Sequence, residues 1–516
     1  EKSLSSKLLK STFTVSSMTM LSRILGFVRD IILARFFGAS AAMDAFLIAF
    51  KIPNFFRRLF AEGAFNQAFV PVLSECKEKE DEARLKDLVN KVAGSLGIIL
   101  TVITILGMLG APFVIMVFAP GAYLHDQAKY QLATELLRYT FPYLLFISLT
   151  AFAGGILNTL GKFSGPAFTP VLLNVCLISA AIWLAPMMDR PIIALGWGVF
   201  IAGIVQFLFQ IPFLCKVGLL PRPQIDFKDP GVQKIKTLII PALFGVSVSQ
   251  INLLLDLILA SFLVSGSISW LYYSDRLMEF PLGIFGVAMA TVILPSLSKK
   301  HANEDPRAFS DTLDWALRIA LIIAIPAAVA LVILAGPMIS TMFQSDAFTA
   351  EDVRLSSYSL MAYSAGLVGF IFIKILAPGY FARQDTRTPV KIGIIAMGAN
   401  MVFNLMLVFP LQHTGLALAT SLSALVNAGL LYRGLRAGGV FHPKAGWGLL
   451  ILKVVLACLI MAGVLLWGAG SLESWTSSGL GQKVWQLLSL IVVGMIVYFM
   501  ALLVLRVNIK ALLVGR

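Results

Sequence analysis

Long apolar segments dominate this sequence and leave few folds open to it. Fourteen segments, each of about 20 or more mostly apolar residues, follow one another along the 516-residue chain. Only 13% of the residues are charged and 58% are hydrophobic, and the mean hydropathy is +0.87. A soluble protein would carry about twice that share of charged residues. Because helices satisfy their own backbone hydrogen bonds in hydrocarbon, we predict an all-α polytopic membrane protein with about 14 transmembrane helices.

The fourteen segments differ in regularity. The second contains Lys51, Pro53, Glu62 and Gly63, so we expect hydropathy alone to miss it or break it. The predicted spans cover residues 14–37, 42–74, 89–119, 131–161, 166–187, 192–216, 234–264, 269–298, 311–343, 355–382, 388–410, 413–435, 447–470 and 484–506.

Basic residues are distributed unevenly among the predicted loops. If the N-terminus is cytoplasmic, most loop Lys and Arg residues face the cytoplasm, and the outer loops carry little beyond Lys129, Arg190 and Lys483. This asymmetry is typical of an even number of spans with both termini inside the cell. The net charge of +14 is therefore explained by membrane topology, and it gives no reason to expect a nucleic-acid partner.

Two motifs recur at an offset near 225 residues. "DIILARF" (30–36) resembles "DLILASF" (256–262), and "FVPVLSE" (69–75) resembles "ILPSLSK" (293–299). The offset contains about six spans, so the two halves keep the same orientation, as in transporters with parallel repeats. We predict two parallel six-helix lobes followed by two further helices, in residues 1–230, 231–440 and 441–516.

Several charged residues lie within the apolar segments, in spans 1 and 2 and at the corresponding place in the second half. Each such Arg or Asp costs roughly 2.5–3.5 kcal/mol at the centre of a bilayer. Arg35 and Arg58 can be explained by mutual neutralisation and by side chains that reach the headgroups. Arg23, Arg29 and Arg276 are harder to explain in this way. We therefore expect a water-filled, Arg-lined cavity between the halves that binds an anion, because guanidinium suits phosphate.

A second group of polar residues could hold a cation. Asp256 lies in the middle of span 7, Asn400 and Asn404 share a face of span 11, and Thr420 lies in span 12. These oxygen-bearing side chains would suit Na⁺ or a proton. In the alternative interpretation, the Asn and Thr side chains only form hydrogen bonds between helices.

The sequence offers no sign of catalysis. It contains no Gly-rich phosphate loop, metal-ligand set, nucleophile–base pair or ATPase module, and its Cys and His residues are scattered. We expect no enzymatic activity and no cofactor, apart from coupling to Na⁺, H⁺ or the membrane potential.

Four long motifs match a known family. They are "SSMTMLSRILGFVRDIILARFFGASAAMDAFLIAFKIPNFFRRLFAEGAFNQAFVP" (16–71), "GVSVSQINLLLDLILASFL" (245–263), "YYSDRLMEFPLGIFGVA" (272–288) and "LAPGYFARQDTRTPVKI" (376–392). The motifs closely resemble those of the MurJ/MviN family, the lipid II flippases of peptidoglycan synthesis. The resemblance extends over essentially the whole chain. The superfamily also contains multidrug exporters and O-antigen flippases.

The resemblance implies a two-lobed fold with a central cationic cavity and a groove for a polyprenyl tail at the last two spans. It also implies a sodium site like the one suggested here around Asp256. The essential charged positions of the family fall on Arg23, Arg29, Asp44, Arg57, Asp275, Arg276 and Glu279.

These positions suggest a division of roles. We expect four arginines to bind the diphosphate and headgroup: Arg23, Arg29, Arg57 and Arg276. We expect four acids to pair with arginines in the substrate-free state and to help close a gate: Asp44, Glu62, Asp275 and Glu279.

The expected function is flipping of lipid II, an undecaprenyl diphosphate that bears a disaccharide–pentapeptide, across a bacterial inner membrane. Membrane lipids and cell-wall synthesis enzymes are the further expected partners. An inside-negative potential would favour outward movement of the anion by about 2.3 kcal/mol per charge per 100 mV. The alternatives are a cation-coupled multidrug exporter, an O-antigen-type flippase and a scaffold that recruits cell-wall enzymes.

Overall fold

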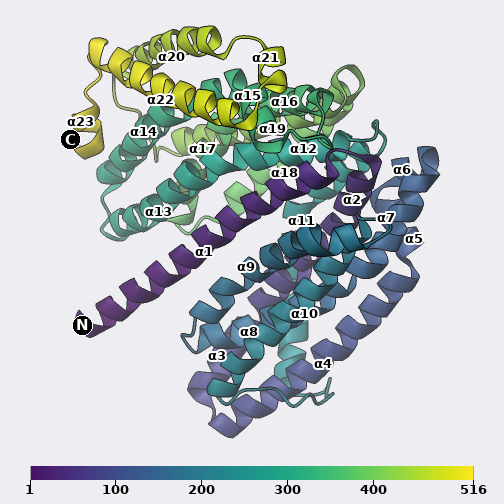
Figure 1. Cartoon of the computed structure of the whole chain (residues 1–516). Coiled ribbons are helices and arrows are strands. Elements are labelled where there is room, and N and C mark those ends of the chain that lie inside the picture. The colour runs from purple at the N-terminus through teal and green to yellow at the C-terminus, as the bar shows by residue number, and fades with distance from the viewer. Residues whose placement is uncertain (1, 515–516) are drawn as a thin grey trace. The chain divides into compact units, whose positions relative to one another are not determined.

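Helices make up every regular element in the part of the chain that is described. The computed structural model describes residues 2–514, without the side chains of residues 2–9, 248, 249, 287, 290, 291, 513 and 514. The chain divides into two compact units, unit 1 (Glu1–Gly266) and unit 2 (Ser267–Arg516) (Figure 1). The predicted all-α fold is confirmed.

Unit 1 contains the first eleven α-helices and three short π- or 3₁₀-helical segments. They are α1 (Lys2–Phe37), α2 (Ala41–Phe56), η1 (Arg57–Phe65), α3 (Asn66–Lys79), α4 (Glu82–Leu109), α5 (Ala111–Phe118), α6 (Pro120–His125), α7 (Gln127–Thr140), α8 (Pro142–Thr159), α9 (Ser164–Ser179), η2 (Ala180–Leu184), η3 (Ala185–Met187), α10 (Ile193–Lys216) and α11 (Pro230–Ser261).

Unit 2 contains the remaining α-helices and one π-helical segment. They are α12 (Ser267–Pro281), η4 (Leu282–Gly286), α13 (Val287–Ala302), α14 (Pro306–Ile333), α15 (Ala335–Phe343), α16 (Ala350–Ser364), α17 (Leu367–Phe381), α18 (Arg387–Leu411), α19 (His413–Ala437), α20 (Trp447–Ala469), α21 (Leu472–Ser477), α22 (Leu480–Val504) and α23 (Ile509–Val514).

Ten helices among the described residues are long and apolar enough to cross a membrane, or eleven if the bent α11 is counted as one span. The three other predicted spans lie on α1, on α2–η1–α3 and on α12–η4–α13, which carry charged residues or breaks. The predicted total of 14 spans is consistent with these helices. Large apolar side chains such as Trp467 on α20 and Trp485 on α22 lie exposed, as expected for helices that face lipid.

The order of elements recurs in the two units. A helix interrupted by a π-helical segment (α2–η1–α3 or α12–η4–α13) precedes a long helix and a short one (α4–α5 or α14–α15). The packing recurs too, since α2 packs on α7 and α12 on α16, while α9 packs on α10 and α18 on α19. These correspondences support the predicted internal repeat. The division by compactness falls after Gly266 and assigns α11 to unit 1, while the boundaries at residues 230 and 440 remain a prediction.

The inner end of α11, as predicted from the loop charges, is attached to unit 1 by a buried carboxylate. Asp229 caps α11 by accepting a hydrogen bond from the Gly231 amide at 2.9 Å. The same carboxylate accepts hydrogen bonds from Arg84 at 2.8 Å and from Lys91 at 3.3 Å, both on α4. The Arg84 guanidinium is the main reason why the pKa of Asp229 lies well below its usual range. Ionised Asp229 therefore joins the start of α11 to α4.

The opposite end of α11 is attached to unit 1 as well. The Ser261 hydroxyl accepts a hydrogen bond from the Gly121 amide at 3.0 Å, and the Gly266 amide donates one to Asp44 Oδ2 at 2.6 Å. Lys129 Nζ lies 3.5 Å from the same Asp44 oxygen, and both side chains are almost fully buried. Gly266 adopts a φ of 101°, which L side chains rarely adopt. The connection that leads out of unit 1 is thus held by a buried ion pair.

In unit 2, a polar ladder on α14 holds the start of α20. Asp314 accepts hydrogen bonds from the Lys444 amide at 3.0 Å and from Trp447 Nε1 at 2.7 Å. Arg318, one turn further along α14, donates to Asp314 at 2.7 Å and lies 4.9 Å from the centre of the Trp447 ring. The Tyr498 hydroxyl on α22 donates to the Ile322 carbonyl of α14 at 2.6 Å. The last two long helices, α20 and α22, are therefore both anchored to α14 by polar contacts.

Asp229→Asn should lower the free energy of unfolding by about 2–3 kcal/mol at pH 7, because it removes a buried carboxylate with two cationic partners. A carboxylate whose pKa is lowered by folding contributes stability above its unfolded pKa, about 4, and loses that contribution as the pH falls further. The stability difference from the unsubstituted protein should therefore narrow below about pH 4. Thermal unfolding of the purified protein in detergent at several pH values measures it. The exposed Asp189→Asn is the control; equal losses in both variants would contradict the anchoring role.

Lys129→Met should destabilise the protein by about 3–5 kcal/mol, because it leaves the buried Asp44 carboxylate without this cation. Lys129→Arg should retain most of the stability, since it keeps the charge. The exposed Lys162→Met serves as the control for loss of a lysine. If Lys129→Met unfolds at the same temperature as Lys162→Met, the ion pair does not hold this end of unit 1.

Candidate functional site

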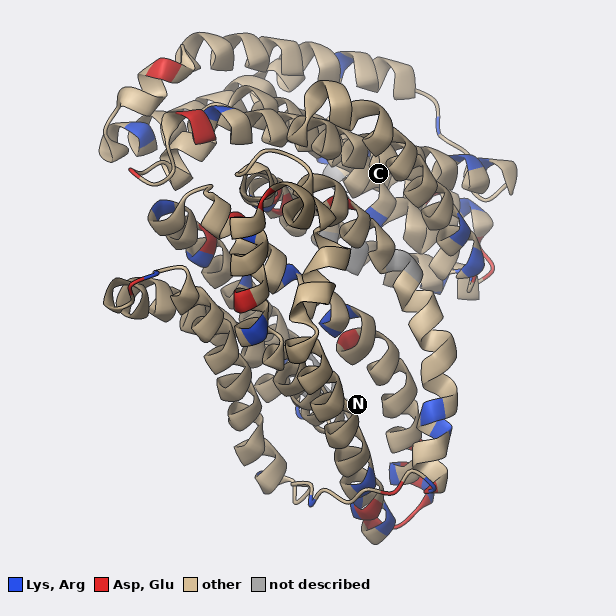
Figure 2. Cartoon of the chain, turned by 90° about the vertical axis from the view of Figure 1, so that its right-hand side faces the viewer, with Lys and Arg blue, Asp and Glu red and all other residues tan. Residues whose placement is uncertain are grey.

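Charged residues gather mainly at helix ends and in loops, while a few patches lie within the helices (Figure 2). The patches within helices include the predicted site residues on α1, α2–η1 and α12. Their contacts decide how each charge is tolerated away from water.

Arg29 lies on α1 and is buried against α9. Its Nε and Nη2 atoms donate to Asp30 Oδ1 at 3.1 and 3.0 Å, and its Nη1 atom donates to Asn174 Oδ1 at 2.9 Å. Asn174, on α9, donates in turn to the Ser22 carbonyl of α1 at 3.1 Å. The pair Arg29–Asp30 therefore joins two helices of unit 1. Arg23, on the same helix, is exposed.

Arg57 is the first residue of the π-helical segment η1. Its Nε atom donates to Asn54 at 3.1 Å, and its Nη1 atom forms an ion pair with Glu62. Residues five apart lie roughly 140° apart around an α-helix. The wider π-helical turn brings these two side chains to the same face. Gly63 of the same segment packs closely on α11, because a Cβ there would come within 2.7 Å of Val246.

Asp44, at the start of α2, lies beside Lys129 of α7, with Lys129 Nζ 3.5 Å from its Oδ2 atom. We predicted that Asp44 pairs with an arginine, and that pairing remains a prediction. Asp44 also accepts the hydrogen bond from the Gly266 amide, as described above. Its predicted gating role remains a prediction.

In unit 2, the charged residues of α12 form a compact group. Arg276 donates to Glu279 at 3.0 Å, and its guanidinium lies 5.6 Å from the centre of the Tyr272 ring. Asp275 is the neighbouring residue and is half-buried. The π-helical segment η4 follows α12 directly, so Arg276 and Glu279 lie just before a break, whereas Arg57 and Glu62 in unit 1 lie within the π-helical segment itself.

The residues predicted for a cation site belong to different units. Asn400 and Asn404 are buried on α18, which packs on α19, and Thr420 on α19 donates to the Leu416 carbonyl at 3.1 Å. The buried Oδ1 atom of Asn400 accepts no hydrogen bond from the described residues. Asp256 lies half-buried on α11 in unit 1. The cation site therefore remains a prediction.

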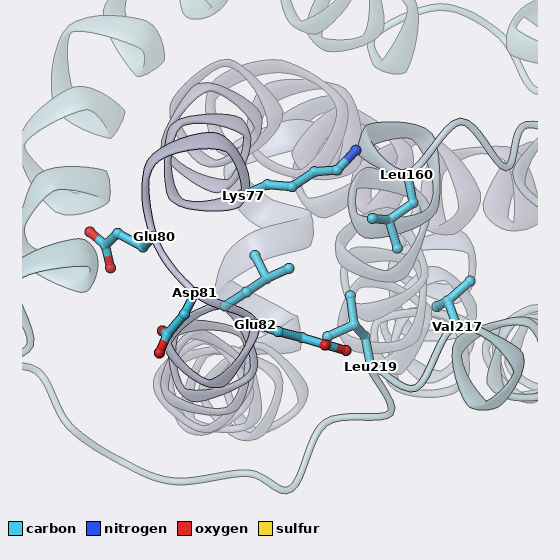
Figure 3. Close-up of a pocket in the computed structure, with 8 residues that line it drawn as sticks. Lys77, Glu80, Asp81, Glu82, Leu160, Val217 and Leu219 are labelled. Carbon is cyan, nitrogen blue, oxygen red and sulfur yellow. The ribbon is translucent and has the colours of Figure 1, made fainter.

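A pocket of about 250 Å³ lies where α3 turns into α4. Its apolar wall includes Leu160, Val217 and Leu219, and Lys77 and Glu82 extend toward this wall (Figure 3). None of the predicted site residues lines it.

Each of three arginines contacts an acid close to it in sequence. The pairs are Arg29–Asp30, Arg57–Glu62 and Arg276–Glu279. Pairing reduces the cost of a charge within a helix, and the partly exposed Arg57 and Arg276 keep surface for a further anion. We did not include Asp30, Asn174 or Lys129 among the predicted site residues. Adjacency to Arg29 could have indicated Asp30, whereas nothing in the local sequence indicates the contacts of Asn174 and Lys129.

Comparison with known proteins identifies relatives of the whole chain. The family model described as "Lipid II flippase MurJ" matches residues 33–485. The probable lipid II flippase MurJ of Vibrio cholerae is 51% identical, with 99% of each chain covered. The corresponding protein of Haemophilus influenzae is 50% identical, with 95% of this chain and 98% of the relative covered.

Solved structures give the same result. A structure of lipid II flippase MurJ in an inward closed conformation matches with a TM-score of 0.80 and 30% identity, and covers 94% of this chain and 97% of that one. An inward-facing multidrug resistance MATE transporter shares the fold, with a TM-score of 0.67 and 16% identity over 83% of this chain and 98% of that one. With its apolar helices, this chain is a multi-pass membrane protein, and it belongs to the MurJ family of lipid II flippases.

Proposed function

We propose that this chain moves lipid II from the cytoplasmic to the outer leaflet of a bacterial inner membrane by alternating access. Membership of the flippase family and the pairing of intramembrane arginines with nearby acids support the proposal. The lipid tail can stay in the bilayer during the movement. The diphosphate and the sugars cannot cross hydrocarbon unaided, because desolvation of charged and polar groups is too costly.

Arg57 and Arg276 are the residues best suited to receive the diphosphate. Both are partly exposed, and both are paired with acids, Glu62 and Glu279, that are about half exposed. A diphosphate can replace these carboxylates on the planar guanidinium, which donates two parallel hydrogen bonds to an oxyanion. Exposed Arg23 would add a third cation. Asp44 and Asp275 complete the set of acids to which we assign gating.

The remaining parts of the cycle follow from the same proposal. The polyprenyl tail would lie along α20 and α22, whose outward apolar side chains are exposed. The inside-negative potential would drive the anion outward, and Na⁺ or H⁺ at Asp256, Asn400, Asn404 and Thr420 would reset the transporter. Both termini would be cytoplasmic. The chain would release lipid II chemically unchanged, and cell-wall synthesis enzymes would then use the lipid II.

Arg276→Ala should reduce the lipid II exposed on the outer face of cells that depend on this chain by about tenfold or more, because a charge-assisted contact to the diphosphate is lost. Labelling of outer-leaflet lipid II at equal protein expression measures the effect. Total lipid II should accumulate at the same time. Arg57→Ala should have a similar effect.

Arg354→Ala is a matched control for Arg276→Ala. Arg354 also pairs with a glutamate three residues away, Glu351, and also lies 5.6 Å from a tyrosine ring, that of Tyr358. Loss of this exposed pair on α16 should leave lipid II exposure within about twofold of normal. If both variants reduce exposure equally, Arg276 has no special role. If neither reduces it, the proposed diphosphate contact is wrong.

A further inference from the structure

We propose that Thr140 is a positioning residue. Its hydroxyl takes the place of the backbone amide that Pro53 lacks, and it thereby fixes the direction in which α2 leads into Arg57. The inference rests on the proposed flippase function, because it explains how one of the arginines that receive the diphosphate is held in place. It gives a role in substrate binding to two residues that carry no charge.

Pro53 interrupts the backbone hydrogen bonds of α2. In an α-helix each carbonyl accepts a hydrogen bond from the amide four residues later, so the amide of residue 53 would donate to the Ala49 carbonyl. Proline has no N–H, and its ring pushes that carbonyl aside and kinks the helix. Both residues are buried. The Ala49 carbonyl therefore needs a donor from another element, because a buried carbonyl without a hydrogen bond is costly in a membrane.

Thr140, the last residue of α7, supplies this donor. Its Oγ1 atom donates to the Ala49 carbonyl at 2.7 Å, and a longer contact of 3.5 Å joins it to the Leu137 carbonyl of its own helix. By contrast, Thr134 and Thr150 donate to carbonyls four residues earlier in their own helices. Thr140 is fully buried, and α2 packs on α7. Its hydroxyl therefore joins the two helices at the turn where α2 lacks an amide.

The turn that follows Pro53 carries Arg57. The Arg57 amide donates to the Pro53 carbonyl, and the Arg57 Nε atom donates to the Asn54 side chain at 3.1 Å. Ala49, Pro53 and Arg57 are four residues apart, so they lie on successive turns of one helix face. A change in the kink at Pro53 would therefore move the guanidinium of Arg57.

The same arrangement occurs in unit 2 on a different pair of helices. Pro326 lies within α14, and the carbonyl four residues before it belongs to Ile322. The Tyr498 hydroxyl of α22 donates to this carbonyl at 2.6 Å, and Tyr498 is buried. In both units a hydroxyl from a neighbouring helix thus bonds the carbonyl that a proline leaves free. This recurrence favours the proline as the reason for each contact.

A double-mutant cycle on thermal unfolding in detergent tests the role of the proline. Thr140→Val keeps the side-chain shape without the hydroxyl, and it should lower the unfolding temperature by about 2 °C or more. In the Pro53→Ala background the same change should lower it by less than about 1 °C, because the amide restored at position 53 bonds the Ala49 carbonyl. Thr140→Ser should unfold close to the unsubstituted protein, since it keeps the hydroxyl.

Affinity for undecaprenyl diphosphate, measured on purified protein, separates positioning from stability alone. Thr140→Val should weaken binding by about fivefold or more, and Pro53→Ala should weaken it similarly because it removes the kink. Combined with Arg57→Ala, Thr140→Val should weaken binding by less than about twofold beyond Arg57→Ala alone, because both changes act through one arginine.

Thr150→Val is the matched control for Thr140→Val. Thr150 is also a buried threonine of unit 1, and its hydroxyl donates to the Phe146 carbonyl of its own helix at 2.7 Å. Because that carbonyl belongs to the same helix, loss of this hydroxyl should change the affinity by less than about twofold. Thr140→Ser should do the same, since it keeps the hydrogen bond to Ala49.

The inference is overturned if Thr140→Val behaves like Thr150→Val, or if it costs the same stability with Pro53→Ala as without it. It is also overturned if Pro53→Ala keeps full affinity, or if the affinity losses of Thr140→Val and Arg57→Ala multiply, because the threonine would then act independently of the arginine. If Thr140→Val does not fold, Thr140→Val/Pro53→Ala must fold for the inference to stand.

Failure of the proposed function looks different. In that case the unsubstituted chain neither binds undecaprenyl diphosphate nor exposes lipid II. The unfolding temperatures of the cycle still report on the contact between Thr140 and the Ala49 carbonyl.

Discussion

Neutralisation of charge within the helices is the constraint on which the rest of this structure depends. A bilayer-spanning chain that must handle an anion needs cations at membrane depth, where each isolated charge is costly. Arg29, Arg57 and Arg276 each meet an acid within five residues. The acid that neutralises each of these arginines therefore lies nearby in the same stretch of chain. Contacts with distant segments are less necessary for neutralising its charge.

The π-helical breaks in the helices accompany these charged pairs. The π-helical segment η1 turns Glu62 toward Arg57, and η4 begins directly after the charged face of α12. Such segments give up regular α-helical hydrogen bonding and occur frequently at functional sites. Buried carboxylates also hold helix ends in place: Asp229 and Asp44 do so at the two ends of α11, and Asp314 does so at the start of α20.

The sequence predicted most reliably those features that local residues determine. The predicted span 413–435 agrees with α19 (His413–Ala437). Hydropathy misses the second span, which lies on α2–η1–α3, as we expected from its charged residues, proline and glycine. The close packing of Gly63 against Val246 of α11 was not predictable, because the two residues lie far apart in the sequence. The contact of Asn174 with Arg29 was missed for the same reason, since the two residues are 145 positions apart. Tertiary contacts of this kind leave no periodic signal in one sequence.

The paired arginines differ in exposure: the side chain of Arg29 is 6% exposed, whereas those of Arg57 and Arg276 are 18% and 32% exposed. A solvent-exposed ion pair contributes only about 0–1 kcal/mol to stability. A buried pair such as Arg29–Asp30 costs about 3–5 kcal/mol to break. The more exposed pairs Arg57–Glu62 and Arg276–Glu279 are therefore easier to open than the buried pair Arg29–Asp30.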